Sequence, residues 1–168
     1  SGVAECRAGP KPADLVPPAA MKIELGDERA SYFVCRGAAR APRGAIKLRY
    51  RADSSEEWAR CRGKAVVVQA WVWLERGGSA RLILQAAVKW PERSTWDFYI
   101  LGQDVTSAAP PRSWVRPTVR AVVSVSAFAP TPGLEPVDVR LRLVVALWEP
   151  VLGLTGTVCV TAPAIYYP

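Results

Sequence analysis

The chain has 168 residues, and its 22 Lys and Arg against 15 Asp and Glu give a formal net charge of +7. Half of the residues are hydrophobic and 22% are charged, a composition that excludes wholesale disorder and fits a single folded domain. Histidine is absent, which excludes Ser-His and Cys-His catalytic pairs and imidazole metal sites. The longest apolar stretch, residues 141–154, is interrupted by Arg142, Glu149 and Pro150, so no membrane span is predicted.

The first 20 residues differ in character from the rest of the chain. Residues 7–20 contain four prolines in a polar setting without periodicity, which is typical of an extended segment. No later change in composition or internal repeat marks a second boundary. We therefore expect an extended, proline-rich N-terminal arm over residues 1–20 and a single domain over residues 21–168.

From residue 21 onward, apolar and polar residues alternate with the period of two that is typical of β-strands. The expected strands cover residues 21–25, 31–36, 45–51, 65–74, 81–89, 97–101, 119–128, 137–147 and 157–161. Gly77-Gly78 and residues 130–133 are expected to form hairpin turns. The sequence predicts an all-β fold, an antiparallel β-sandwich of about eight or nine strands that is immunoglobulin-like or jelly-roll-like.

One segment carries a helix pattern. Ser54 followed by Glu57 is a capping box, and Gly63 is placed where a helix would stop. A single short helix is therefore expected near residues 55–62.

The four cysteines are Cys6, Cys35, Cys61 and Cys159, and no two of them form a C-x-x-C pair. Two disulfides in an oxidising compartment are the simpler interpretation, with Cys35–Cys61 and Cys6–Cys159 as the favoured pairing. A secreted or extracellular protein is expected, and a periplasmic one is the variant of this hypothesis. Four free thiols in a cytosolic protein are the alternative.

Basic residues fall on one face of two expected strands. Lys47, Arg49 and Arg51 alternate with apolar residues, and Arg140 and Arg142 do the same further along the chain. Guanidinium groups suit carboxylate, sulfate and phosphate ligands, so these five residues are candidates for binding an acidic partner. The alternative is that they form the solvated face of amphipathic strands. Nucleic acid is not the expected partner, because the cysteines favour an oxidising compartment.

Two tryptophans, Trp71 and Trp73, share a face of the expected strand 65–74. If Gly77-Gly78 is a two-residue hairpin loop, as Gly-Gly favours, both indoles face the core. A three-residue loop would shift the register by one residue and expose them as an aromatic platform for sugars or a protein interface.

Evidence for catalysis is weak. No nucleophile elbow, P-loop or zinc-protease motif occurs. Glu92 and Asp97 could form a carboxylate pair, and Glu24, Asp27 and Glu28 could hold calcium, although a solvated turn explains the three acids better. We expect no enzymatic activity, no cofactor and no metal.

The sequence thus predicts a secreted, disulfide-bonded binding module that recognises another protein, as a receptor-like, inhibitory or host-directed factor. The alternative is a module that binds carbohydrate or a polyanion through exposed tryptophans or basic strand faces. A histidine-free carboxylate hydrolase is the third hypothesis. The expected partner is an extracellular protein or an acidic glycan, and the oligomeric state is left open.

Overall fold

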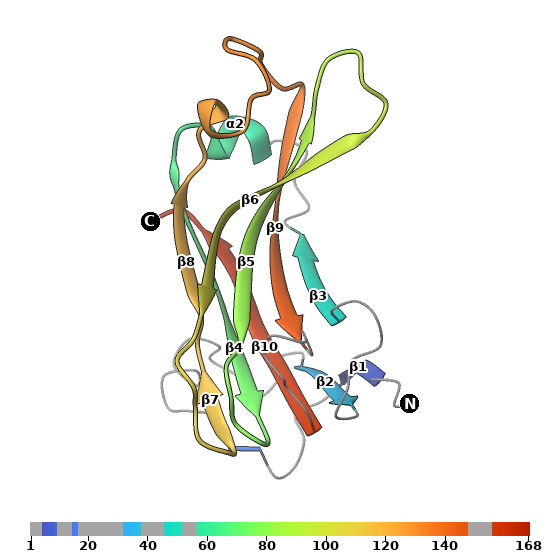
Figure 1. Cartoon of the computed structure of the whole chain (residues 1–168), viewed down its shortest axis with the longest axis vertical. Coiled ribbons are helices and arrows are strands. Elements are labelled where there is room, and N and C mark those ends of the chain that lie inside the picture. The colour runs from blue at the N-terminus through green and yellow to red at the C-terminus, as the bar shows by residue number, and fades with distance from the viewer. Residues whose placement is uncertain (1–4, 10–14, 17–31, 38–45, 52–56, 148–155) are drawn as a thin grey trace.

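The computed structural model describes residues 5–9, 15–16, 32–37, 46–51, 57–147 and 156–168. This part of the chain forms two antiparallel sheets, so the prediction of an antiparallel β-sandwich is confirmed. In Figure 1, the short helix α2 (Glu57–Cys61) lies at the same end of the sandwich as the hairpin between β5 and β6 and the loop before β9. The expected helix near residues 55–62 is therefore present.

Sheet A has the strand order β1-β2-β10-β4-β7, and β8 also pairs with β4. Its strands are β1 (Glu5–Gly9), β2 (Tyr32–Gly37), β4 (Ala65–Leu74), β7 (Ser113–Val115), β8 (Thr118–Val122) and β10 (Gly156–Tyr166). Sheet B has the order β3-β9-β5-β6. Its strands are β3 (Ile46–Arg51), β5 (Arg81–Lys89), β6 (Trp96–Val105) and β9 (Asp138–Leu147).

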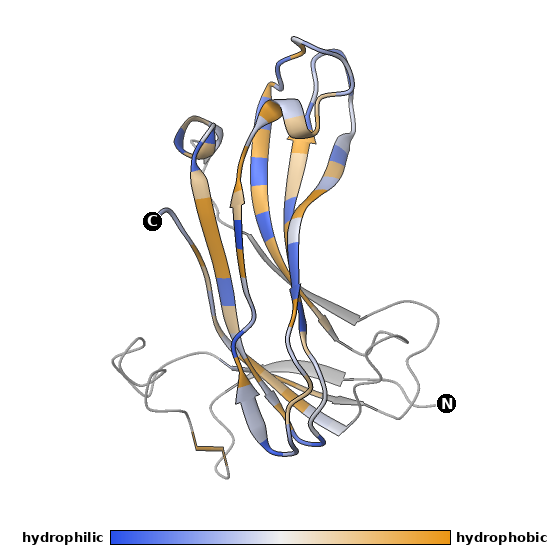
Figure 2. Ribbon diagram, turned by 60° about the vertical axis from the view of Figure 1, so that its left-hand side comes forward, coloured by the Kyte–Doolittle hydropathy of each residue, from blue (hydrophilic) through white to orange (hydrophobic). Residues whose placement is uncertain are grey.

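The core lies between the two sheets and is built from every second residue of their longest strands. Figure 2 shows hydrophobic residues along strands of both sheets, interrupted by hydrophilic ones. Burying a Val or Leu side chain is worth about 1.5–3 kcal/mol, so these alternating positions supply most of the force that joins the sheets. The buried positions contributed by β4, β5 and β9 are Val66, Val68, Ala70, Val72, Leu74, Leu82, Leu84, Ala86, Val88, Val139, Leu141, Leu143 and Val145.

The turn at Gly77-Gly78 is not the predicted hairpin, because β4 belongs to sheet A and β5 to sheet B. The chain crosses between the sheets here, and Gly78 forms a bridge with Ala109. Gly77 has a φ of 72°, and a Cβ at this position would clash with the carbonyl oxygen of Ala109. The glycines are therefore required for a close backbone approach, a use that the Gly-Gly pattern does not distinguish from a hairpin. Residues 130–133 likewise precede a strand of the other sheet.

Several strand limits differ from the prediction. The expected strand over residues 119–128 ends at Val122 and is followed by a 3₁₀ turn, η1 (Val125–Ala127). Strand β6 is longer than expected, and β1 and β7 were not predicted. The expected strand at residues 21–25 lies outside the described residues. Most of the expected arm does too, so the division at residue 20 stays a prediction, although Glu5–Gly9 pairs with β2.

The predicted disulfide pairing is wrong, because neither Cys61 nor Cys159 is in a disulfide bond, and both are buried. Cys61 lies in the main core, and Cys159 packs in a second apolar cluster on the outer face of sheet A. Cys6 instead stands opposite Cys35 in the β1–β2 register. Sequence spacing could not reveal this neighbour, because 28 residues separate the two cysteines and a spacing does not give the register of the strands.

We expect one disulfide, Cys6–Cys35, because paired antiparallel residues have Cα atoms about 4.5–5.5 Å apart, within the disulfide range. Burial raises the pKa of the Cys159 thiol to about 12, so the reactive thiolate is scarce at neutral pH. Iodoacetamide should label Cys61 and Cys159 only after unfolding. Non-reducing peptide mapping after labelling in buffer and in guanidinium checks this, and a Cys35–Cys61 or Cys6–Cys159 peptide would contradict it.

Strand β6, at the end of sheet B, is held against β8 of sheet A. A Cβ added at Gly102 would lie 2.7 Å from Cγ1 of Val119, so β6 approaches β8 closely at this glycine. The backbone N–H of Thr118 donates a hydrogen bond to Oδ2 of Asp104 at 2.9 Å. These contacts fix the position of β6 relative to the rest of the sandwich.

Replacing Gly102 with alanine should destabilise the fold by about 1–3 kcal/mol, because a well-packed contact has no room for the methyl group. The control is Val119→Ala, which removes the opposing Cγ1 atom. The double variant should lose less stability than the two single variants together, by at least about 0.5 kcal/mol. Urea unfolding of all four proteins measures this, and strictly additive losses would show that the contact does not exist.

Candidate functional site

The outer face of sheet B carries a row of apolar side chains along β6, which we call the β6 row: Trp96, Phe98 and Ile100. Phe98 is 50% exposed and Ile100 is 59% exposed. The alternate residues Tyr99 and Leu101 pack against the core instead. Because side chains alternate across a strand, burying Tyr99 and Leu101 forces the β6 row to the outside.

Two arginines of β9 lie over the rings of the β6 row. Cζ of Arg140 is 5.0 Å from the ring centroid of Trp96, and Cζ of Arg142 is 4.6 Å from that of Phe98. Strand β5 runs between them, and its residue Ala87 is paired with both Arg140 and Phe98. Ala87 is small and only 2% exposed, which fits side chains that cross over it. Such cation–π contacts contribute about 0.5–1 kcal/mol each at an exposed site.

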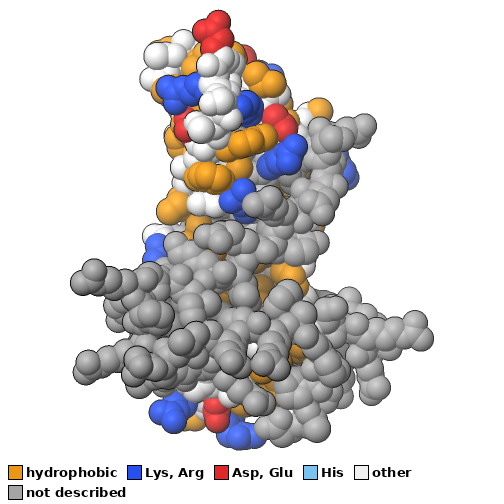
Figure 3. Space-filling model, turned by 90° about the vertical axis from the view of Figure 1, so that its right-hand side faces the viewer, with side chains coloured by type: hydrophobic (Ala, Val, Ile, Leu, Met, Phe, Trp, Pro, Cys, Tyr) orange, Lys and Arg blue, Asp and Glu red, His pale blue; other side chains and the backbone are white. Residues whose placement is uncertain are grey.

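Polar groups surround these rings on the same face. Gln85 is paired with Arg142 on one side and with Ile100 on the other. Arg81 donates hydrogen bonds to Oε1 of Gln103 at 2.7 and 3.2 Å. In the upper part of Figure 3, hydrophobic and basic side chains lie next to one another on the molecular surface. We call this face the sheet B surface. It consists of the β6 row, the β9 arginines Arg140 and Arg142, and Arg81, Gln85 and Gln103.

The structure brings the two predicted basic groups to neighbouring strands. In the β3–β9 register, Arg51 is opposite Arg142, Arg49 is opposite Val144 and Lys47 is opposite Ala146. The side chains of the three β3 residues lie outside the described part of the structure, so their role in binding stays a prediction. Arg140 and Arg142 belong to the sheet B surface.

Trp71 and Trp73 lie on the outer face of sheet A, whereas Val72 between them faces the core. Trp73 is 5% exposed and packs with Leu15, Tyr32 and Cys159. Both alternatives for these tryptophans assumed a β4–β5 hairpin, which the fold does not contain. Their predicted use as a binding platform is untested, but Trp73 has little free surface.

Three neighbours complete the surroundings of these tryptophans. Arg112 lies over Trp73 with Cζ 5.7 Å from its ring centroid, and Arg116 lies over Trp71 at 5.3 Å. Trp114 meets Trp71 edge-on at 6.4 Å and donates its indole N–H to the carbonyl oxygen of Val16 at 3.0 Å. The arrangement is a packed cluster.

Sequence reasoning missed Trp96 and Phe98. The alternation Trp96, Phe98, Ile100 was visible, but the intervening Tyr99 and Leu101 are equally apolar. Period-two patterning identifies the exposed face only when one of the two faces is polar. The partners of these rings, Arg140 and Arg142, were among the predicted residues.

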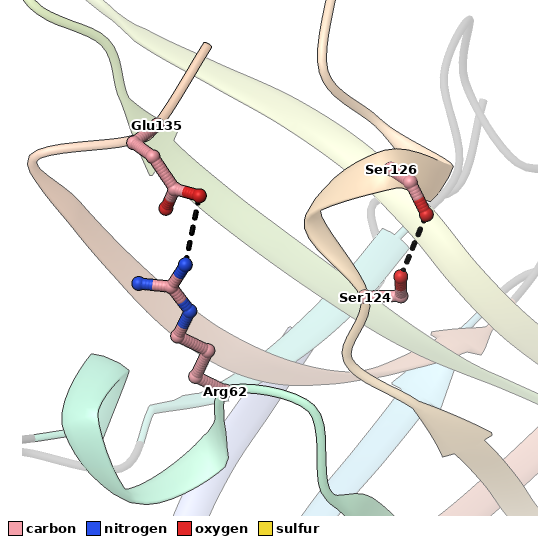
Figure 4. Close-up of polar contacts among 4 residues, drawn as sticks. All are labelled: Arg62, Ser124, Ser126 and Glu135. Atoms are coloured by element: carbon pink, nitrogen blue, oxygen red, sulfur yellow. Dashed lines mark hydrogen bonds and ion pairs between the residues drawn. The ribbon is translucent and has the colours of Figure 1, made fainter. Parts of the chain in front are cut away.

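A hollow of about 390 Å³ lies at the end of the sandwich that holds α2. It is lined mainly by apolar residues of η1 and the loop that follows, together with Ser126 and Glu135. Figure 4 shows the ion pair between Arg62 and Glu135, at 2.7 Å, and the hydrogen bond between the hydroxyls of Ser124 and Ser126, at 2.8 Å. The Glu135 carboxylate therefore already has a charged partner within the protein, Arg62.

The remaining candidates from the sequence are the Glu92–Asp97 carboxylate pair and the three acids proposed for calcium. Asp97 forms an ion pair with Arg93 at 3.0 Å, and Glu92 is exposed on the turn before β6 with a φ of 62°. No group of three or more metal-ligating acids or cysteines occurs within the described ranges. Glu24, Asp27 and Glu28, the calcium candidates, lie outside them. Of the helices in the described ranges, none is long and apolar enough to cross a membrane.

No family profile and no curated protein sequence matches the chain. Among solved structures it is similar to the C-terminal family 22 carbohydrate-binding module of Clostridium thermocellum Xyn10B, at 10% identity and a TM-score of 0.47, over 99% of this chain and 84% of that one. It is also similar to the CBM22-2 xylan-binding domain of Paenibacillus barcinonensis Xyn10C, at 9% identity and a TM-score of 0.45, over 82% and 79%.

A third similar structure is the family 11 carbohydrate-binding module of Clostridium thermocellum in complex with a β-1,3-1,4-mixed-linked tetrasaccharide. The identity is 10% and the TM-score 0.45, over 97% of this chain and 85% of that one. At such low identities the likeness concerns the fold. The three structures are described as modules for carbohydrate, none as a module for protein, and against these findings the prediction of a protein-recognising module is wrong.

Proposed function

We propose that this chain is a non-catalytic carbohydrate-binding module that holds a polysaccharide on the sheet B surface. One observation carries the proposal. The β6 row presents an aromatic ring and an aliphatic side chain that are each half exposed, beside two arginines stacked on rings of the same row. The solved modules named above recognise ligands of the same class.

The chemistry of this surface suits a sugar chain. A pyranose ring has an apolar face of C–H groups and a rim of hydroxyls. The apolar face packs on an aromatic or aliphatic side chain, and the rim needs hydrogen-bond partners of fixed direction. Phe98 and Ile100 offer the first, and the amides of Gln85 and Gln103 and the guanidinium of Arg140 offer the second.

The stacked arginines also reduce the cost of binding. A free arginine side chain loses about 2 kcal/mol of rotamer entropy when it is fixed in one geometry. Here contacts with Trp96 and Phe98 already hold the guanidinium groups of Arg140 and Arg142 over these rings. A ligand would therefore meet donors that are preorganised before it arrives.

The proposal assigns no reaction to the chain, and it includes a location where polysaccharides occur, outside the cell or in the periplasm. A Cys6–Cys35 disulfide would agree with such an oxidising compartment.

Replacing the exposed ring should weaken binding without unfolding the protein. We expect Phe98→Ala to lower the affinity for a bound polysaccharide about fivefold to tenfold, since a stacked aromatic ring contributes about 1 kcal/mol beyond its buried area. Trp96→Ala should do the same and also release Arg140. Isothermal titration against xylan, mixed-linkage β-glucan, dextran and polygalacturonate measures the effect.

The matched control is Val122→Ala, which removes an apolar side chain of 58% exposure from β8 of the other sheet. This variant should bind like the unmodified protein. Melting temperatures of the three variants within a few degrees of each other would exclude unfolding as the cause. Failure of the unmodified protein to bind any of the four polymers, or unchanged affinity in Phe98→Ala, would refute the proposal.

A further inference from the structure

Cations outnumber carboxylates at the described outward positions of the sheet B surface. Its described outward positions on β5, β6 and β9 include the cations Arg81, Lys89, Arg140 and Arg142, against the single carboxylate of Asp138. These strands are adjacent in the sheet, so the positive charges gather on one face. A surface on which cations predominate attracts an anionic sugar chain more strongly than a neutral one.

Arg140 is placed to bind an anion. Within the described part of the chain, its contacts are the Trp96 ring and a hydrogen bond from its Nε to Oδ2 of Asp138 at 3.2 Å. The two terminal nitrogens of the guanidinium have no partner there. Asp138 thus orients the Arg140 guanidinium through its Nε atom. The two terminal nitrogens then face outward as a fork, a geometry that matches two oxygens of a carboxylate or sulfate group.

Arg140 and Arg142 are two residues apart on β9, a spacing of about 7 Å along the strand. Both lie on the same face and both stack on rings of the β6 row. An anionic group bound at Arg140 would therefore lie beside a surface that packs against the sugar ring. A cation next to an apolar row favours a charged sugar, which can use both, over an anion without a ring, which can use only the cation.

We infer that the ligand of this surface is an acidic polysaccharide, one whose sugars carry carboxylate or sulfate groups that pair with Arg140 while the rings pack on the β6 row. This inference rests on the proposed function and goes beyond it, because carbohydrate binding alone does not require charge on the ligand.

The test compares two polymers with the same sugar backbone, one with free carboxylates and one with the carboxylates esterified and uncharged. Polygalacturonate and its fully methyl-esterified form share one backbone, so the ratio of their affinities reports on the carboxylates alone. We expect at least a tenfold preference for polygalacturonate at low salt, which falls as salt screens the charges. Dextran sulfate against dextran forms a second pair, and a stronger preference there would identify sulfate esters as the recognised groups.

The variant Arg140→Gln/Arg142→Gln keeps hydrogen-bonding amides and removes both charges. It should bring the affinity ratio of the charged and esterified polymers to near one. The matched control Arg60→Gln/Arg120→Gln lowers the net charge equally, at two exposed arginines of α2 and β8, and should keep the ratio. Melting curves show whether both variants are folded, and Arg140→Gln alone serves if the double variant is not.

The outcomes separate the inference from the proposed function. Equal affinity for the charged and neutral form of both pairs would overturn the inference and leave the proposed function standing. No binding to any of these polymers, nor to xylan and mixed-linkage β-glucan, would overturn both. Equally tight binding of double-stranded DNA and polygalacturonate would show a general polyanion surface and overturn the assignment to a sugar ligand.

Discussion

The sandwich depends on the burial of one aliphatic face from each sheet. Strand β4 of sheet A and strands β5 and β9 of sheet B place Val, Leu and Ala at alternate positions that are nearly inaccessible to solvent. Since a strand must turn its other residues outward, this burial dictates which side chains reach the outer faces. The arginines of β9 and the side chains of the β6 row lie on the outer face because Leu141, Leu143 and Tyr99 face the core.

The alternation was strong enough to predict the longest strands from the sequence. The limits of β4 and β5 coincide with the expected ones, and β9 begins one residue later. How the strands associate was predicted less well, because Gly77-Gly78 fits a hairpin as well as a crossover between sheets. The difference lies in Ala109, whose carbonyl oxygen fills the space beside Gly77. A contact across 32 residues leaves no trace in a local pattern.

The site was predicted in part, for the same physical reason. Arg140 and Arg142 alternate with leucines, so their outward direction could be read from the sequence. Trp96 and Phe98 alternate with Tyr99 and Leu101, and apolar residues on both faces hide the direction of a strand. The cysteines were mispaired because the register that brings Cys6 opposite Cys35 is set by β1, a strand that the sequence pattern did not reveal.

Both sheets carry arginines stacked on aromatic rings on their outer faces, yet the two sets differ in what else they contact. On sheet A, Trp73 is buried beside Leu15, and the indole N–H of Trp114 is bonded to Val16. The protein itself occupies that face, so its arginine–aromatic contacts stabilise the packing of the chain. On sheet B, Phe98 and Ile100 keep half or more of their surface in solvent, and the forked end of Arg140 has no protein partner among the described residues. The same chemistry therefore serves structure where it is covered and ligand recognition where it is open.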